Sequence, residues 1–166
     1  MRRVILLLSL TAGSLAAQDA AVAVARGNWL SGHNMVLKTA EQLPDSLLAY
    51  RPTALVRSFG ELFGHVAGAE YVFCAVVLGE PPRAEDAVEK SAKTKAALIQ
   101  ALKDAGAYCE RAYAITDAAS RGMTKLFGSD RSKLDVLVLN ATHDWEHYGN
   151  LVTYLRLKGL VPPSSQ

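Results

Sequence analysis

Four long segments with apolar residues at helical spacing constrain the fold of this chain most strongly. They cover roughly residues 19–42, 58–78, 85–117 and 131–158, and each repeats apolar side chains every three or four positions. No segment shows sustained strand alternation. Because 166 residues are enough for one hydrophobic core, the pattern predicts an all-α fold, a four-helix bundle in a single domain.

Start and stop signals support these boundaries. Ser58 and Glu61 form the S-x-x-E pattern of a capping box directly before an apolar run, which predicts the start of the second helix. Ser129 or Asp130 is expected to cap the last helix, and Gly159 is expected to end it.

The N-terminus has the pattern of a secretory signal peptide. Two arginines precede an apolar stretch, and small residues follow up to Ala17, so we expect a leader over residues 1–17, cleaved after Ala16 or Ala17, and a bundle domain over residues 18–166. The alternatives are a first turn of helix or an uncleaved anchor. The apolar run is shorter than the ~20 residues that span a bilayer, so no stable membrane span is expected. An exported protein, periplasmic or secreted, is the prediction.

Charge argues against a nucleic-acid partner. The chain has 18 basic and 16 acidic residues, and removal of the leader takes away two arginines and no acid. The mature chain would therefore be formally neutral. It lacks the basic footprint that nucleic-acid binding requires.

The two cysteines leave two possibilities open. Cys74 and Cys109 form no CxxC motif and fall in the second and third expected helices. In an oxidising compartment they could form a disulfide, and in the cytosol they would be two buried thiols.

Three of the four histidines are placed as a metal site would need them. His143 and His147 are four residues apart, so they project from one helix face, and His65 lies in an apolar stretch of another helix. Packing alone is the alternative, but three buried imidazoles would leave three acceptor nitrogens unmatched, at about 1–3 kcal/mol each. We therefore expect these three residues to hold a divalent transition metal, with zinc or nickel favoured.

Other residues are weaker candidates. Asp144 could orient a ligand or handle a proton as a catalytic group, and its alternative is an ion pair with a basic side chain such as Arg57. His33 is expected in the core or lining a pocket, and Trp145 is expected in the core. A metalloprotease helix is disfavoured because Asp144 stands where that motif needs glutamate.

Two segments resemble a known family. Ser58-Phe-Gly-Glu-Leu-Phe-Gly-His65 and Asn140-Ala-Thr-His-Asp-Trp-Glu-His147, with the Gly159 to Pro163 ending, are similar to signatures of the DinB-like (DinB/YfiT-like) superfamily. The resemblance implies a four-helix bundle, often dimeric, with a three-histidine metal site at His65, His143 and His147. Characterised relatives include thiol-dependent S-transferases and a thiol-dependent isomerase, and many members have no established activity.

The chain departs from this family in two respects. Tyr148-Gly149-Asn150 stands where many relatives carry Arg-Gly-Gln, and the leader is unusual because the thiols of relatives are chiefly cytoplasmic. Three functions stay open on this basis. The first is a metal-dependent transferase, of thiol type, or hydrolase with a small-molecule substrate. The others are a non-catalytic metal- or ligand-binding module related to stress, and a purely structural bundle.

Overall fold

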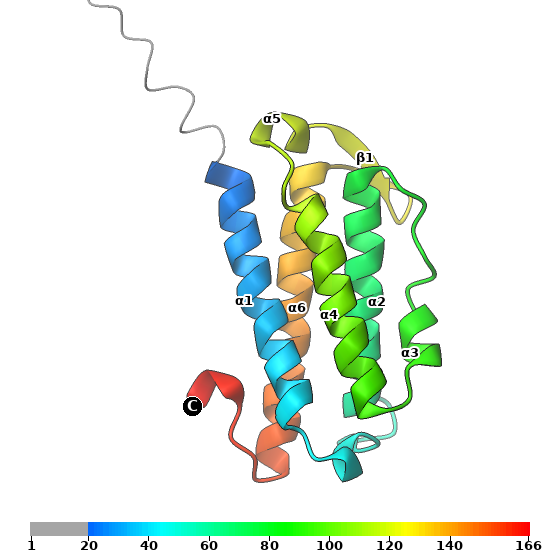
Figure 1. Ribbon diagram of the computed structural model, residues 1–166, viewed down its shortest axis with the longest axis vertical. Helices are drawn as coiled ribbons and strands as arrows, with labels where there is room; N and C mark the ends of the chain where they lie inside the picture. Colours follow the sequence, from blue (N-terminus) through cyan, green and yellow to red (C-terminus); the bar gives the residue numbers. More distant parts are fainter. Residues whose placement is uncertain (1–19) are drawn as a thin grey trace, which may run out of the picture.

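Four long helices form the bundle in the computed structural model, which describes residues 20–166 (Figure 1). They are α1 (Ala20–Gln42), α2 (Phe59–Leu78), α4 (Lys95–Ala112) and α6 (Lys133–Leu157). Helix α1 packs against α6 and α4, and α2 packs against α4 and α6. The expected helical bundle is confirmed. The predicted leader lies outside the described residues.

Short elements complete the chain. A 3-10 turn, η1, follows α1, and α5, β1 and β2 lie together at the opposite end of the bundle (Figure 1). Their bounds are η1 Asp45–Leu47, α3 Ala87–Ser91, α5 Asp117–Ser120, β1 Met123–Leu126, β2 Ser129–Ser132 and η2 Pro163–Ser165.

The helix predicted over residues 85–117 is wrong as a single element. It is divided into α3 and α4, because Ala92 leaves the helical conformation with ψ 107° and Thr94 begins a new helix. The Thr94 side chain accepts a hydrogen bond from the Ala97 backbone N–H at 3.2 Å, which satisfies one donor of the new N-terminus. The helix then ends at Ala112, and Thr116 caps the short α5.

The loop predicted before the last helix contains an antiparallel hairpin of β1 and β2. Its turn residues, Phe127 and Gly128, have φ values of 49° and 82°, and positive φ at both positions is what a two-residue hairpin turn of type I′ needs. The predicted caps Ser129 and Asp130 are therefore wrong. Ser132 caps α6 instead, and its side chain accepts from the Asp135 N–H at 3.1 Å.

The predicted start of α2 is confirmed. The Ser58 N–H donates to Glu61 Oε2 at 2.7 Å, and the Ser58 hydroxyl accepts from the Glu61 N–H at 3.3 Å. By length and composition α2 could cross a membrane, but 89% of its apolar window is buried inside the bundle. Its hydrophobicity is thus explained by its place in the core.

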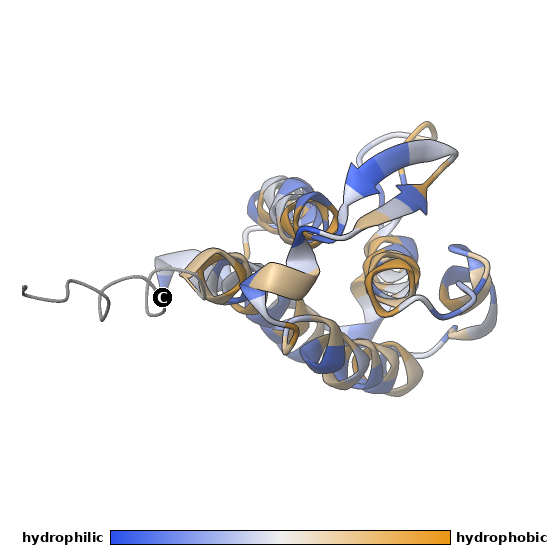
Figure 2. Cartoon of the chain, turned by 90° about the horizontal axis from the view of Figure 1, so that it is seen from above, coloured by the Kyte–Doolittle hydropathy of each residue, from blue (hydrophilic) through white to orange (hydrophobic). Residues whose placement is uncertain are grey.

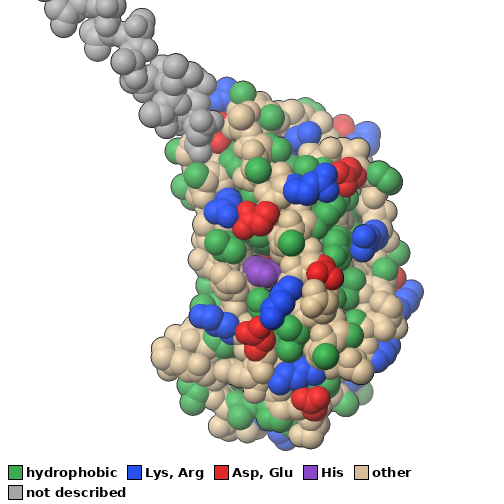
Figure 3. All heavy atoms as spheres, viewed as in Figure 1, with side chains coloured by type: hydrophobic (Ala, Val, Ile, Leu, Met, Phe, Trp, Pro, Cys, Tyr) green, Lys and Arg blue, Asp and Glu red, His purple; other side chains and the backbone are tan. Residues whose placement is uncertain are grey.

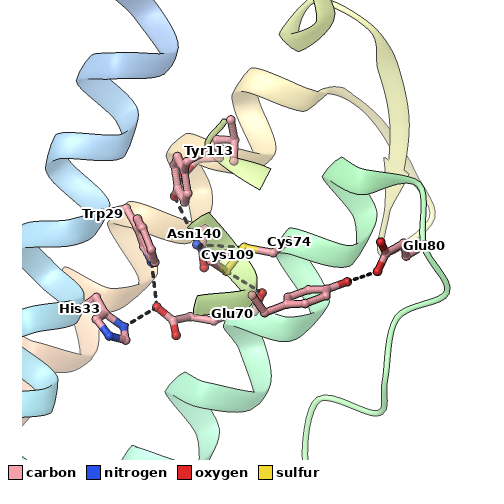
Figure 4. Close-up of a disulfide and its surroundings, with 10 residues drawn as sticks. Trp29, His33, Glu70, Cys74, Glu80, Cys109, Tyr113 and Asn140 are labelled. Atoms are coloured by element: carbon pink, nitrogen blue, oxygen red, sulfur yellow. Dashed lines mark hydrogen bonds and ion pairs between the residues drawn. A yellow bond between two sulfur atoms is a disulfide. The ribbon is translucent and has the colours of Figure 1, made fainter. Parts of the chain in front are cut away.

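A disulfide joins α2 to α4 in this core. Cys74 and Cys109 are fully buried with Cα atoms 5.3 Å apart, and Figure 4 shows the bridge beside Asn140. Of the two possibilities left open by the sequence, the structure has the bridged one. The core prediction for Trp145 is wrong, because its side chain is 40% exposed and its indole N–H donates to the Asn28 carbonyl.

The bundle surface carries mixed charge. Seen from above in Figure 2, the long helices carry both hydrophobic and hydrophilic residues, and the hairpin stands at the edge of the bundle. On the face shown in Figure 3, Lys and Arg side chains lie beside Asp and Glu side chains, without an extended area of one sign.

Candidate metal centre

Two packed helices bring the three predicted histidines together. His65 comes from α2, about two turns after its capping box, and His143 and His147 lie one turn apart on α6. The Nε2 atom of His65 is 3.1 Å from those of both His143 and His147, which are themselves 3.0 Å apart. Three nitrogen atoms therefore converge on one point.

This arrangement fits a metal ion. Imidazole nitrogens bind zinc at about 2.0–2.1 Å, which holds the nitrogens of one ion about 3.0–3.4 Å apart at common coordination angles. The observed separations lie in this range. The three residues form a group whose nitrogen atoms could hold one ion, and an all-imidazole set suits zinc, nickel, iron or copper.

The protonation of these residues also suits ligation. Burial, with the positive charges of Arg57 and His147, lowers the pKa of His65 to about 4. Burial, with the other two histidines and Arg57, lowers the pKa of His143 to about 3. Burial also lowers the pKa of His147, against the raising effect of Glu146. All three are neutral at neutral pH, which is the form that binds a metal.

A carboxylate lies beside the outer ring nitrogen of His65. Glu85 Oε1 is 3.3 Å from Nδ1 of His65, the nitrogen turned away from the convergence point. Its segment crosses α2 directly over Gly68, where a Cβ would overlap the Glu85 carbonyl oxygen. Such a carboxylate fixes the ring orientation of a ligating histidine. Glu85 could not be predicted from the sequence, because its position depends on this close crossing.

An open pocket lies beside the histidines. It has a volume of about 560 Å³ and includes His147, and a second opening of about 340 Å³ includes His65. Arg57 lines both of them. The larger pocket is lined by Arg51, Ala54, Leu55, Val56, Arg57, Glu61, Leu62, Glu89, His147, Asn150 and Tyr154. Its volume is that of a typical small-molecule site.

The acidic residues of this pocket are paired. Both oxygens of Glu61 accept from the guanidinium of Arg51, at 2.9 and 2.8 Å. Glu89 Oε2 accepts from Nε of Arg57 at 3.2 Å. The predicted alternative role of Asp144, an ion pair with a basic side chain such as Arg57, is wrong, because neither Asp144 oxygen has a partner among the described residues.

Asp144 instead lies in the core, beside a second buried group. The side chain is fully buried, neither of its oxygens has a hydrogen-bond partner within residues 20–166, and it does not line either opening. Burial, with the nearby Glu70 carboxylate, raises the pKa of Asp144 well above its usual value. Asp144 is thus a core residue, placed away from the pocket.

Glu70 organises this group and was missed from the sequence. Its Oε1 accepts from the indole N–H of Trp29 at 2.8 Å and lies 2.9 Å from Nδ1 of His33 (Figure 4). Burial opposes protonation of His33, but the charge of Glu70 and this hydrogen bond outweigh it and raise the pKa of His33. A glutamate within the apolar α2 stretch was the available signal. His33 lies in the core, one of its two expected places.

Solved structures share the fold. A DinB-like protein from Bacillus cereus ATCC 10987 aligns with a TM-score of 0.72 at 15% identity, over 84% of this chain and 93% of that one. A DinB-like protein from Bacillus subtilis aligns with a TM-score of 0.59 at 20% identity, over 84% and 92%. No curated protein matches the chain.

The family follows from the sequence match. The sequence matches the DinB superfamily over residues 30–151. This range covers most of the chain and includes all three converging histidines. The chain therefore belongs to the DinB superfamily.

Proposed function

We propose that this protein is a metal-dependent enzyme, a thiol-type transferase or a hydrolase, that acts on a small molecule. The observation that carries the proposal is the convergence of three neutral imidazole nitrogens, one of them from His147, which lines a pocket of about 560 Å³. When bound there, a divalent ion supplies the Lewis acidity that lowers the pKa of a thiol or of water.

The residues of the chain take distinct roles in this proposal. His65, His143 and His147 hold the ion, and Glu85 orients His65. The pocket beside them binds the electrophilic substrate. Zinc and nickel are the proposed ions, because both accept an all-imidazole ligand set.

An exported location is part of the proposal. The buried disulfide supports it, because stable disulfides belong to oxidising compartments. The basic, apolar and small-residue pattern of residues 1–17 supports it independently. In such a compartment the thiols used by characterised relatives would be scarce, which favours water or an extracellular thiol as nucleophile.

Turnover by matched variants tests the proposed activity. The zinc- and nickel-loaded protein is assayed with thiol acceptors and with ester substrates, beside His143→Ala and, as a control, His33→Asn. His33 is the one histidine outside the group of His65, His143 and His147, and it belongs to a separate buried group with Glu70 and Asp144. We expect turnover by the wild type and the control and its loss in His143→Ala. Equal turnover by His143→Ala would refute the metal-dependent mechanism.

A non-catalytic binding module is the second candidate. The observation that favours it is the pairing of Glu61 and Glu89 with arginines, which leaves the larger pocket without an unpaired carboxylate to act as a base. This candidate predicts metal binding with no turnover above that of the free ion.

A further inference from the structure

We propose that Arg57 binds the carboxylate of a bifunctional substrate whose other end reaches the three histidines. The inference rests on the proposed function and adds to it the chemical class of the substrate, a small organic anion. Arg57 lines both the pocket that includes His147 and the opening that includes His65, so it is shared by the two openings that reach the histidines.

The guanidinium of Arg57 has hydrogen-bond donors that are not used within the described residues. Among residues 20–166 its one hydrogen bond is from Nε to Glu89, so both terminal nitrogens are left without a protein acceptor. The side chain is 42% exposed, which places these nitrogens within reach of a solute. Two parallel N–H groups of arginine match the two oxygens of a carboxylate.

Neighbouring charges do not compete for this role. Arg51 is occupied by both oxygens of Glu61. Of the acids at the second opening, Glu85 faces His65 and Asp86 pairs with Lys90. Glu61, Glu89 and Asp86 thus each pair with a basic side chain and Glu85 faces the neutral His65, while the terminal nitrogens of Arg57 have no acceptor among residues 20–166.

The backbone of Arg57 is held in place. The Tyr154 hydroxyl donates to the Arg57 carbonyl at 3.0 Å, and the Tyr154 ring meets Phe59 edge-on at a centroid distance of 5.4 Å. The next residue, Ser58, is the cap of α2. This fixed origin lets the side chain present its guanidinium at a defined place beside the histidines.

The rest of the pocket suits an apolar body between the two ends of the ligand. Leu55 lines the pocket and is 96% exposed, and Val56 beside it is 39% exposed. Exposed side chains of this kind gain contact area when a ligand covers them. The geometry therefore favours an anion with a short apolar segment.

Two thiols of equal length test the inference. The protein is loaded with cobalt(II), and 3-mercaptopropionate and 3-mercapto-1-propanol, which differ in the carboxylate alone, are titrated while sulfur-to-cobalt absorption is followed. We expect wild type to bind the carboxylate about tenfold more tightly, as a charge-assisted pair would give. Arg57→Gln should bind both thiols equally, and Arg83→Gln, which changes an arginine stacked on Tyr71, should keep the preference.

A second measurement needs no metal. In the metal-free protein, titration with propionate should shift the Arg57 Nε–Hε NMR resonance to saturation. Equal affinities of the two thiols for wild type, or a preference unchanged in Arg57→Gln, would overturn the inference. Failure of the proposed function looks different, because neither thiol would then produce the absorption band. In that case the propionate titration decides whether Arg57 binds a carboxylate, and an Arg57 resonance that does not shift would overturn the inference.

Discussion

The disulfide between Cys74 and Cys109 makes a quantitative prediction about stability. The two residues are 35 positions apart, and the bridge closes a loop of that length in the unfolded chain. Loop-closure entropy for 35 residues corresponds to about 4 kcal/mol at 25 °C, because the bridge removes that entropy from the unfolded state. Reduction should lower the free energy of unfolding by about this amount.

Urea unfolding of oxidised and reduced wild type measures this difference without any substitution. With a slope of about 2 kcal/mol/M, the midpoint should fall by about 2 M on reduction. The double variant Cys74→Ala/Cys109→Ala serves as control, because reductant should leave its midpoint unchanged.

Two results would refute the reasoning. One is the same midpoint for the oxidised and reduced protein. The other is the alkylation of two thiols in urea before any reductant is added, which would show that the bridge is not formed.

Two further predictions concern groups around the centre. In Gly68→Ala the new Cβ would overlap the Glu85 carbonyl oxygen, so Glu85 should move away from His65. The affinity for zinc should then fall about tenfold, as measured by competition with a chelator. Gly149→Ala is the control, because its Cβ would lie in open space, and it should bind zinc as the wild type does. The raised pKa of His33 means that its contribution to stability is complete below the unfolded value of about 6.5 and is lost as pH rises through the folded pKa. The stability gap between wild type and His33→Asn should therefore be larger at pH 6 than at pH 9 in urea unfolding, and an equal gap would contradict the pairing with Glu70.

Periodicity and caps predicted the bundle because both are local. The start of α2 depends on Ser58 and Glu61 alone, and these residues are three positions apart. The division of the third helix and the hairpin were missed for a related reason. Thr94 could be read as an ordinary helical residue, and strands of four largely polar residues show no alternation strong enough to detect.

The group of three histidines was predictable because two of its members lie on one helix at a spacing that the sequence shows directly. His143 and His147 are four residues apart, and His65 is the histidine of the most apolar helix. Glu85 and Arg57 could not be placed from the sequence. They lie on segments whose positions depend on the crossing at Gly68 and on the Tyr154 hydrogen bond, and both are tertiary contacts.

Measurement of metal binding at equilibrium tests the central claim, that the three histidines bind one metal ion, most directly. The zinc and nickel content and the dissociation constants of wild type are compared with those of His65→Ala, His143→Ala and His147→Ala. We predict one ion per wild-type chain and a loss of affinity of at least about a hundredfold in each variant, because a direct ligand contributes more than the 10–100-fold of its hydrogen-bond partners. A wild type that stays metal-free after reconstitution, or a His143→Ala variant that binds as wild type does, would contradict the account.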